Sequence, residues 1–192
     1  MHGETTRITL LVTYVLEQLG IAYLVGGSLA SSLHGVMRAT LTVDIVADIQ
    51  LKHIPALVAA LAQEFYADAE MMQDAIERRS SFNLIHYATA FKVDIFIRKV
   101  RPFDQMQFER RVRSVIVADP EQSIYMASPE DIILAKLEWY RLGGEVSDRQ
   151  WRDILGVMKV RAGELDLDYL QHWAKELQVA DLFDRALRSS AE

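Results

Sequence analysis

The feature that most constrains the fold is a Gly-Gly-Ser turn at Gly26, Gly27 and Ser28, which separates a short apolar run from a helical pattern. Residues 21–25 are almost all apolar, and apolar residues resume at helical spacing over residues 29–33. A strand, a glycine turn and a helix in this order are typical of a phosphate-binding element, because backbone N–H groups at a helix N-terminus attract anions. The same pattern also occurs where a turn has only a geometric role.

Two alternating runs place acidic residues on polar strand faces. In the first run, every second residue from Val43 to Ile49 is apolar, and the other face carries Thr42, Asp44, Val46 and Asp48. In the second run, from Phe91 to Ile97, Asp94 lies on the face opposite the apolar Val93, Ile95 and Ile97. If the two strands are neighbours, Asp94 lies beside Asp44.

The whole chain predicts an α+β fold, with a mixed sheet flanked by helices in residues 1–118 and a helical C-terminal region in residues 119–192. The run 91–97 and a strand at 82–87 before it read as a hairpin, and two β-like runs follow at 112–117 and 123–126. Ser128 and Pro129 supply an N-cap and a first helical residue, so a helix begins there. We place the boundary near Asp119 and Pro120.

Composition excludes several classes of protein. The 192 residues include no cysteine, so a disulfide framework and thiolate metal sites are excluded, and the five histidines show no i, i+4 pair typical of a zinc site. No apolar run approaches the length needed to span a membrane, and we expect a cytoplasmic protein. The net charge of −6 argues against sequence-independent binding to nucleic acid. A local basic segment, either a solvated surface or a site for triphosphate or acceptor, comprises Arg98, Lys99, Arg101, Arg110, Arg111 and Arg113.

The segment VGGSLASSLHGVMRATLTVDIVADI is similar to the opening motif of polymerase-beta-type nucleotidyltransferases, in which a D-x-[DE] pair follows the glycine turn. The segment FKVDIFI supplies the later acid, Asp94. This resemblance implies transfer of a nucleoside monophosphate from an NTP to a hydroxyl of RNA, protein or a small molecule. Gly26, Gly27 and Ser28 would bind the nucleotide, and the catalytic Asp44 and Asp94 would hold Mg²⁺.

The tail SPEDIILAKLEWYRLGGEVSDRQWRDIL resembles the abortive-infection, toxin-like branch of that superfamily. The resemblance implies a catalytic role for Lys136, a place for Asp153 in the nucleotide site, and a partner protein in a toxin-antitoxin-like pair. Two simpler interpretations stay open. Lys136 can extend its ammonium group past apolar neighbours to solvent, and Asp153 can pair with Arg149 one helical turn earlier.

Two registers of the acidic motif are possible. In the first, Arg38 and Thr40 match the Arg-x-Thr-x-Asp-x-Asp pattern, so the acidic pair falls on Thr42 and Asp44, with thirteen residues between the turn and the pair. We favour this register because of its loop length, and it adds Arg38 and Thr42 to the nucleotide site. In the second register, Asp44 is the first acid and Val46 occupies the second position.

In either register a neutral side chain replaces one metal-binding carboxylate, and a threonine hydroxyl is a poor Mg²⁺ ligand. Two functions therefore stay open. The chain is either a Mg²⁺-dependent nucleotidyltransferase or a degenerate nucleotidyltransferase fold that binds a nucleotide or a partner protein. The acceptor and the base preference do not follow from the sequence.

Overall fold

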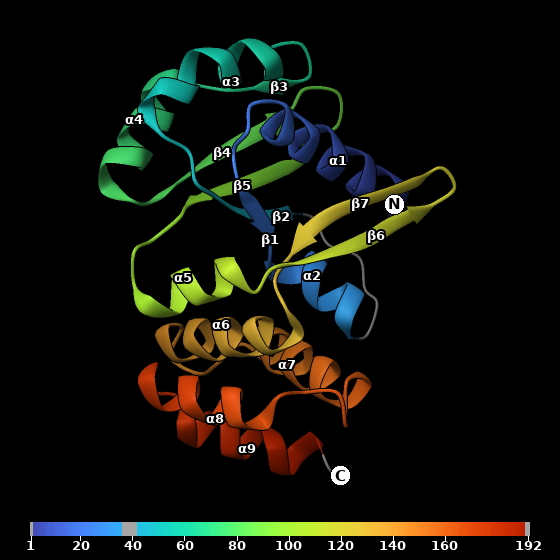
Figure 1. The fold of residues 1–192 in the computed structure, drawn as a ribbon, viewed down its shortest axis with the longest axis vertical. Helices are drawn as coiled ribbons and strands as arrows, with labels where there is room; N and C mark the ends of the chain where they lie inside the picture. Colours follow the sequence, from blue (N-terminus) through green and yellow to red (C-terminus); the bar gives the residue numbers. More distant parts are fainter. Residues whose placement is uncertain (1, 36–41, 191–192) are drawn as a thin grey trace. The chain divides into compact units, whose positions relative to one another are not determined.

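The computed structural model describes residues 2–35 and 42–190 and divides into two compact units (Figure 1). One unit comprises Met1–Leu29 and Ala39–Met126, and the other comprises Ala30–Arg38 and Ala127–Glu192. The first unit combines helices with all the strands found in the described residues, and the second is helical. The predicted α+β class is confirmed.

Within the described residues, the α/β unit is built on a seven-stranded sheet with the order β3-β4-β5-β2-β1-β7-β6. The pairs β2–β5 and β1–β7 are parallel, and the other pairs are antiparallel, including the predicted β4–β5 hairpin. The strands are β1 (Tyr23–Val25), β2 (Thr42–Ala47), β3 (Phe65–Tyr66), β4 (Ser81–His86), β5 (Lys92–Ile97), β6 (Val112–Ala118) and β7 (Glu121–Met126).

The core of this unit follows from the two periodicities in the sequence. Ile8, Val12 and Leu16 recur one helical turn apart on α1 and are at most 1% exposed. One alternating apolar face of each of β2 and β5 is also buried. Helix α1 contacts β2 and α3, and α4 contacts β4 and β5. The helices are α1 (His2–Gln18), η1 (Leu51–His53), α3 (Ile54–Leu61), α4 (Ala69–Arg78) and α5 (Pro102–Glu109).

The helical unit contains α6 (Pro129–Leu142), α7 (Asp148–Val160), α8 (Leu167–Glu176) and α9 (Ala180–Ser190). The boundary between the units falls within α2 (Gly27–His34). The predicted N-cap is confirmed, since the Ser128 side chain accepts a hydrogen bond from the Asp131 N–H. Ser147 and Asp166 cap α7 and α8 in the same way. In the described part of the chain, every helix is too short or too polar to cross a lipid bilayer.

The division between the units falls after Met126 instead of near the predicted position at residues 118 and 119. The reason is that β7 pairs with both β6 and β1, so it belongs to the sheet. Asp119 and Pro120 form the turn of the β6–β7 hairpin. Proline after a polar residue marks a turn as readily as a linker, and here it marks a turn.

Candidate functional site

The glycine turn lies where the chain passes from β1 into α2. The Gly26 N–H donates to the carbonyl oxygen of Asp44 at 2.9 Å, which fixes the turn to β2. Gly27 is the first residue of α2 and has a φ of 58°, a left-handed conformation that favours glycine. Ser28 is the second helical residue, and Arg38, also predicted in the nucleotide site, lies outside the described residues. The predicted strand, turn and helix are confirmed.

The Asp44 carboxylate lies directly against Gly27. A Cβ atom at position 27 would come within 1.7 Å of Asp44 Oδ2 and 2.6 Å of its Cγ, so a side chain there would displace the acid. Gly26 has more room, since its added Cβ would meet only Leu24 Cδ1, at 3.9 Å. Gly27 is therefore required by the position of Asp44, whose negative charge is favourable beside the first turn of a helix.

Asp44 and Asp94 are direct partners on the parallel strands β2 and β5. Adjacent strands lie about 4.8 Å apart, and directly paired residues project from the same face of a sheet. The residues on either side of each acid are fully buried apolar side chains, whereas the acids themselves are half-buried. The adjacency of the two acids, predicted from two separate alternating runs, is confirmed.

This pair of carboxylates suits a single Mg²⁺ ion. Mg²⁺ takes oxygen ligands, keeps several waters, and is commonly held by one or two carboxylates together with substrate phosphates. Among residues 2–35 and 42–190, no group of three or more His, Cys, Asp and Glu side chains is placed to hold a metal. Asp44 and Asp94 are the residues that could hold such an ion together with substrate phosphates.

The two motif registers correspond to opposite sides of Asp44 along β2. Thr42 is the first residue of β2 and lies at the end nearest the glycine turn, because β1 runs antiparallel to β2 and leads into that turn. Val46 pairs with Leu24 on one side and with Phe96 on the other. A carboxylate at position 46 would lie between apolar neighbours, whereas one at position 42 would lie beside the turn.

Lys136 and Asp153 meet inside the helical unit, on α6 and α7. Lys136 Nζ lies 2.9 Å from Asp153 Oδ2, and the two side chains are only 10% and 8% exposed. The Ser31 hydroxyl of α2 donates to the same carboxylate oxygen at 3.5 Å. Lys136 therefore does not extend to solvent, and the residues that the toxin-like resemblance selected form one buried ion pair.

Asp94 has a polar neighbour to which the sequence analysis assigns no role. Asn83 of β4 pairs directly with Asp94, and its side-chain amide donates to the Asp94 carboxylate. In the sequence, Asn83 is distinguished only as a polar amide between two apolar residues, Phe82 and Leu84, which are buried in the structure. That pattern is common to half-exposed strands, so it did not single out Asn83.

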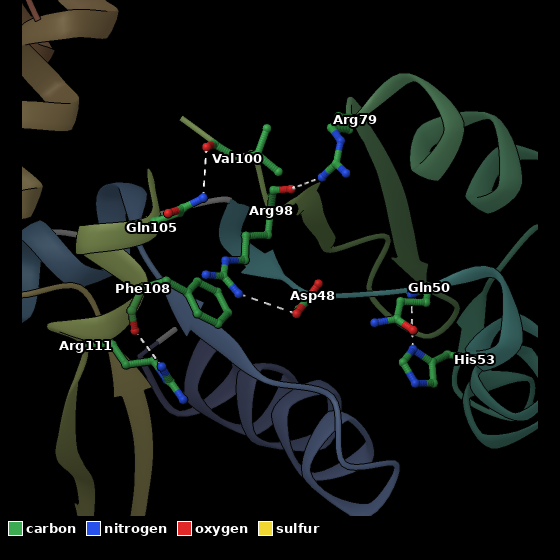
Figure 2. Close-up of polar contacts among 9 residues, drawn as sticks. All are labelled: Asp48, Gln50, His53, Arg79, Arg98, Val100, Gln105, Phe108 and Arg111. Atoms are coloured by element: carbon green, nitrogen blue, oxygen red, sulfur yellow. Dashed lines mark hydrogen bonds and ion pairs between the residues drawn. The ribbon is translucent and has the colours of Figure 1, made fainter. Parts of the chain in front are cut away.

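The basic segment after β5 is held by groups of the α/β unit itself (Figure 2). Arg98 NH1 lies 3.5 Å from Asp48 Oδ2, and the Arg98 guanidinium lies 4.5 Å from the centre of the Phe108 ring. Arg111 donates to the Phe108 carbonyl oxygen, and its guanidinium lies 4.8 Å from the same ring. The Arg98 contact holds α5 beside the end of β5, and the Arg111 contacts tie the residues after α5 to that helix, so both arginines have a structural role.

Three solved structures share this fold. The solution structure of the antibiotic-resistance factor ANT(2'')-Ia aligns with a TM-score of 0.59 at 11% identity, over 98% of this chain and 100% of that chain. The lincomycin-bound crystal structure of the lincosamide antibiotic adenylyltransferase LnuA aligns with a TM-score of 0.50 at 13% identity, over 83% of this chain and 98% of that chain. The crystal structure of an antigenic nucleotidyltransferase-like protein from Paracoccidioides brasiliensis aligns with a TM-score of 0.52 at 18% identity, over 94% of this chain and 91% of that chain.

No protein-family model and no curated protein matches the sequence. The structural similarities establish that the chain has a nucleotidyltransferase-like fold, as predicted from the glycine turn and the alternating acidic strands. At identities of 11% to 18% they establish the fold alone.

The contact between Gly27 and Asp44 predicts different outcomes for two adjacent substitutions. Gly27→Ala should destabilise the protein by about 1–3 kcal/mol, because alanine is strained in the left-handed region and its Cβ collides with the carboxylate. Gly26→Ala is the matched control and should unfold close to the wild-type midpoint. Urea denaturation of the three proteins makes the comparison, and equal midpoints would contradict the close approach.

Breaking the buried ion pair should lower the free energy of unfolding more than breaking an exposed one. Lys136→Met leaves the Asp153 carboxylate buried without its ammonium partner, and loss of one member of such a pair typically costs about 3–5 kcal/mol. The control is Arg78→Met, because the Arg78–Asp74 pair has side chains that are 75% and 56% exposed. We expect that change to cost less than about 1 kcal/mol in urea unfolding. Similar losses in the two variants would contradict a special role for the buried pair.

Proposed function

We propose that the α/β unit binds an NTP with Mg²⁺ and transfers a nucleoside monophosphate to an acceptor hydroxyl. The observation that carries this proposal is the convergence of the Gly27 turn with Asp44 and Asp94 on neighbouring strands. The nucleotidyltransferase-like fold supports it, and one protein with this fold is an adenylyltransferase of lincosamide antibiotics. A small-molecule hydroxyl is therefore included among the acceptors to be tested, beside RNA and protein.

The position of Asp44 supports the need for a cation. Phosphates bound by backbone N–H groups at the start of α2 would lie close to the carboxylate that covers Gly27. Two negative groups at such a distance repel each other, and a divalent ion between them converts this repulsion into attraction. The bound ion would neutralise phosphate charge and make the acceptor hydroxyl more acidic.

Each group of residues then has a distinct role in the proposed reaction. The Gly27 and Ser28 N–H groups orient the phosphates, and Asp44 and Asp94 hold the ion. A carboxylate of this pair accepts the proton of the hydroxyl as its oxygen attacks the α-phosphorus and pyrophosphate leaves. From the resemblance of the tail, we assign a catalytic contribution to Lys136 and nucleotide contacts to Arg38, Thr42 and Asp153.

A second candidate function is a binding module with little or no transfer. It is favoured by the neutral Thr42 next to Asp44 on the same strand face, since a hydroxyl contributes little to Mg²⁺ binding. In this function the turn still binds nucleotide, because its backbone donors do not depend on the missing acid. The physiological ligand would then be a nucleotide or the partner protein of a toxin-antitoxin-like pair.

Transfer of label from α-labelled NTPs to RNA, protein and hydroxyl-bearing small molecules tests the proposal. Asp94→Asn should reduce transfer by about a hundredfold or more, because it removes a carboxylate that would hold the cation whose positive charge stabilises the transition state. Thr42→Asp should raise transfer, because it adds a carboxylate to Asp44 and Asp94 on the same face, about 6.6 Å along the strand from Asp44.

Val46→Asp is the matched control for the register, since it lies at the same spacing on the other side of Asp44, between Leu24 and Phe96. We expect it to leave transfer at or below the wild-type rate. Activation by Val46→Asp instead of Thr42→Asp would show that the second register is correct. An inactive wild type that neither substitution activates would favour the binding module.

A further inference from the structure

A row of three polar side chains crosses three neighbouring strands of the sheet. Asp44 on β2 pairs directly with Asp94 on β5, which pairs directly with Asn83 on β4. Each of the three is half-buried and is flanked along its own strand by buried apolar residues, so all three project from the same face. From the strand spacing, the row extends over about 10 Å.

The amide of Asn83 is oriented by its contact with Asp94. Its Nδ2 donates to Asp94 Oδ1, and Asn83 is the only residue that hydrogen-bonds the Asp94 side chain among residues 2–35 and 42–190. An ionised carboxylate accepts hydrogen bonds and donates none, so the NH₂ group of the amide must face it. The Asn83 carbonyl oxygen consequently points away from Asp94 as an acceptor, and the second Asp94 oxygen is left for another ligand.

Asn83 differs from the other residues on its strand face. Ser81 and Ile85, two positions away on either side, are exposed, whereas Asn83 is half-buried. Asparagine is disfavoured in strands, and a β-branched or aromatic residue at this position would suit the sheet better. The cross-strand bond to Asp94 is the local interaction that distinguishes this position from its neighbours.

We propose that Asn83 is a positioning residue for the metal-binding carboxylate of Asp94 and completes the metal site on the β4 side. This inference rests on the proposed function, in which Asp44 and Asp94 hold Mg²⁺. By donating to one oxygen, the amide fixes the plane of the Asp94 carboxylate and offsets part of its repulsion with Asp44. Its carbonyl oxygen would be available to accept a hydrogen bond from a water ligand of the ion, since Mg²⁺ usually keeps several waters.

The test measures metal affinity separately from stability. Paramagnetic resonance follows free Mn²⁺ during titration, alone and with each of the four NTPs, for the wild type, Asn83→Leu, Asn83→Ala, Ser81→Ala and Asp94→Asn. Leucine has nearly the shape of asparagine and a stronger preference for strands, so Asn83→Leu should keep or raise the thermal midpoint. Ser81→Ala is the matched control on the same face of the same strand.

We expect Asn83→Leu and Asn83→Ala to weaken Mn²⁺ binding about 10–100-fold, the usual effect of removing a group that orients a metal ligand. Ser81→Ala should bind Mn²⁺ like the wild type. Wild-type affinity in both Asn83 variants would overturn the inference and leave the proposed function standing. If the wild type and Asp94→Asn bind Mn²⁺ equally, the ion is not held at Asp94, and the proposed function and this inference fall together.

Discussion

The close approach of the Asp44 carboxylate to Gly27 is the contact on which the candidate site depends. It requires a residue without a side chain at the first position of α2, in a backbone conformation that glycine adopts without strain. It also ties the turn to β2, because the Gly26 N–H donates to the Asp44 carbonyl. The parallel pairing of β2 with β5 then places Asp94 beside Asp44. Asp44 thus contacts the glycine turn and lies beside Asp94 of the neighbouring strand.

The helical unit contains a buried ion pair. Lys136 and Asp153 are both nearly buried and neutralise each other, and Ser31 donates to the same carboxylate. Removing water from two charged groups costs free energy. The close contact between the two charges, together with the Ser31 hydrogen bond, offsets that cost. Helix α2 contributes Gly27 and Ser28 to one unit and Ser31 to the other.

The sequence was informative where a local pattern determines the structure. Alternation in two runs was enough to place Asp44 and Asp94 on polar strand faces, and Ser128 with Pro129 was enough to begin α6. In each case the signal spans a few residues and has a geometric cause in the backbone. The nucleotidyltransferase-like fold was implied by the resemblance of the segments that contain the turn and these acids.

Contacts between distant segments were not predictable in the same way. The i, i+4 spacing of Arg149 and Asp153 is visible in the sequence, whereas the pairing of Asp153 with Lys136, which lies on another helix, is not. Asn83 was not predicted as a site residue, because its contact with Asp94 arises from β4–β5 pairing and not from its neighbours in sequence. The Asp119–Pro120 dipeptide marked a chain reversal within the sheet, which local composition could not separate from a linker.

The central claim is that Asp44, Asp94 and the glycine turn form one site for a metal ion and phosphates. Anomalous diffraction from crystals grown with Mn²⁺ and a non-hydrolysable NTP analogue tests it most directly. The account predicts an anomalous peak within about 2–2.5 Å of oxygens of both carboxylates, with phosphate density at the N–H groups of Gly27 and Ser28. A nucleotide bound elsewhere, or an ion that contacts neither carboxylate, would contradict it.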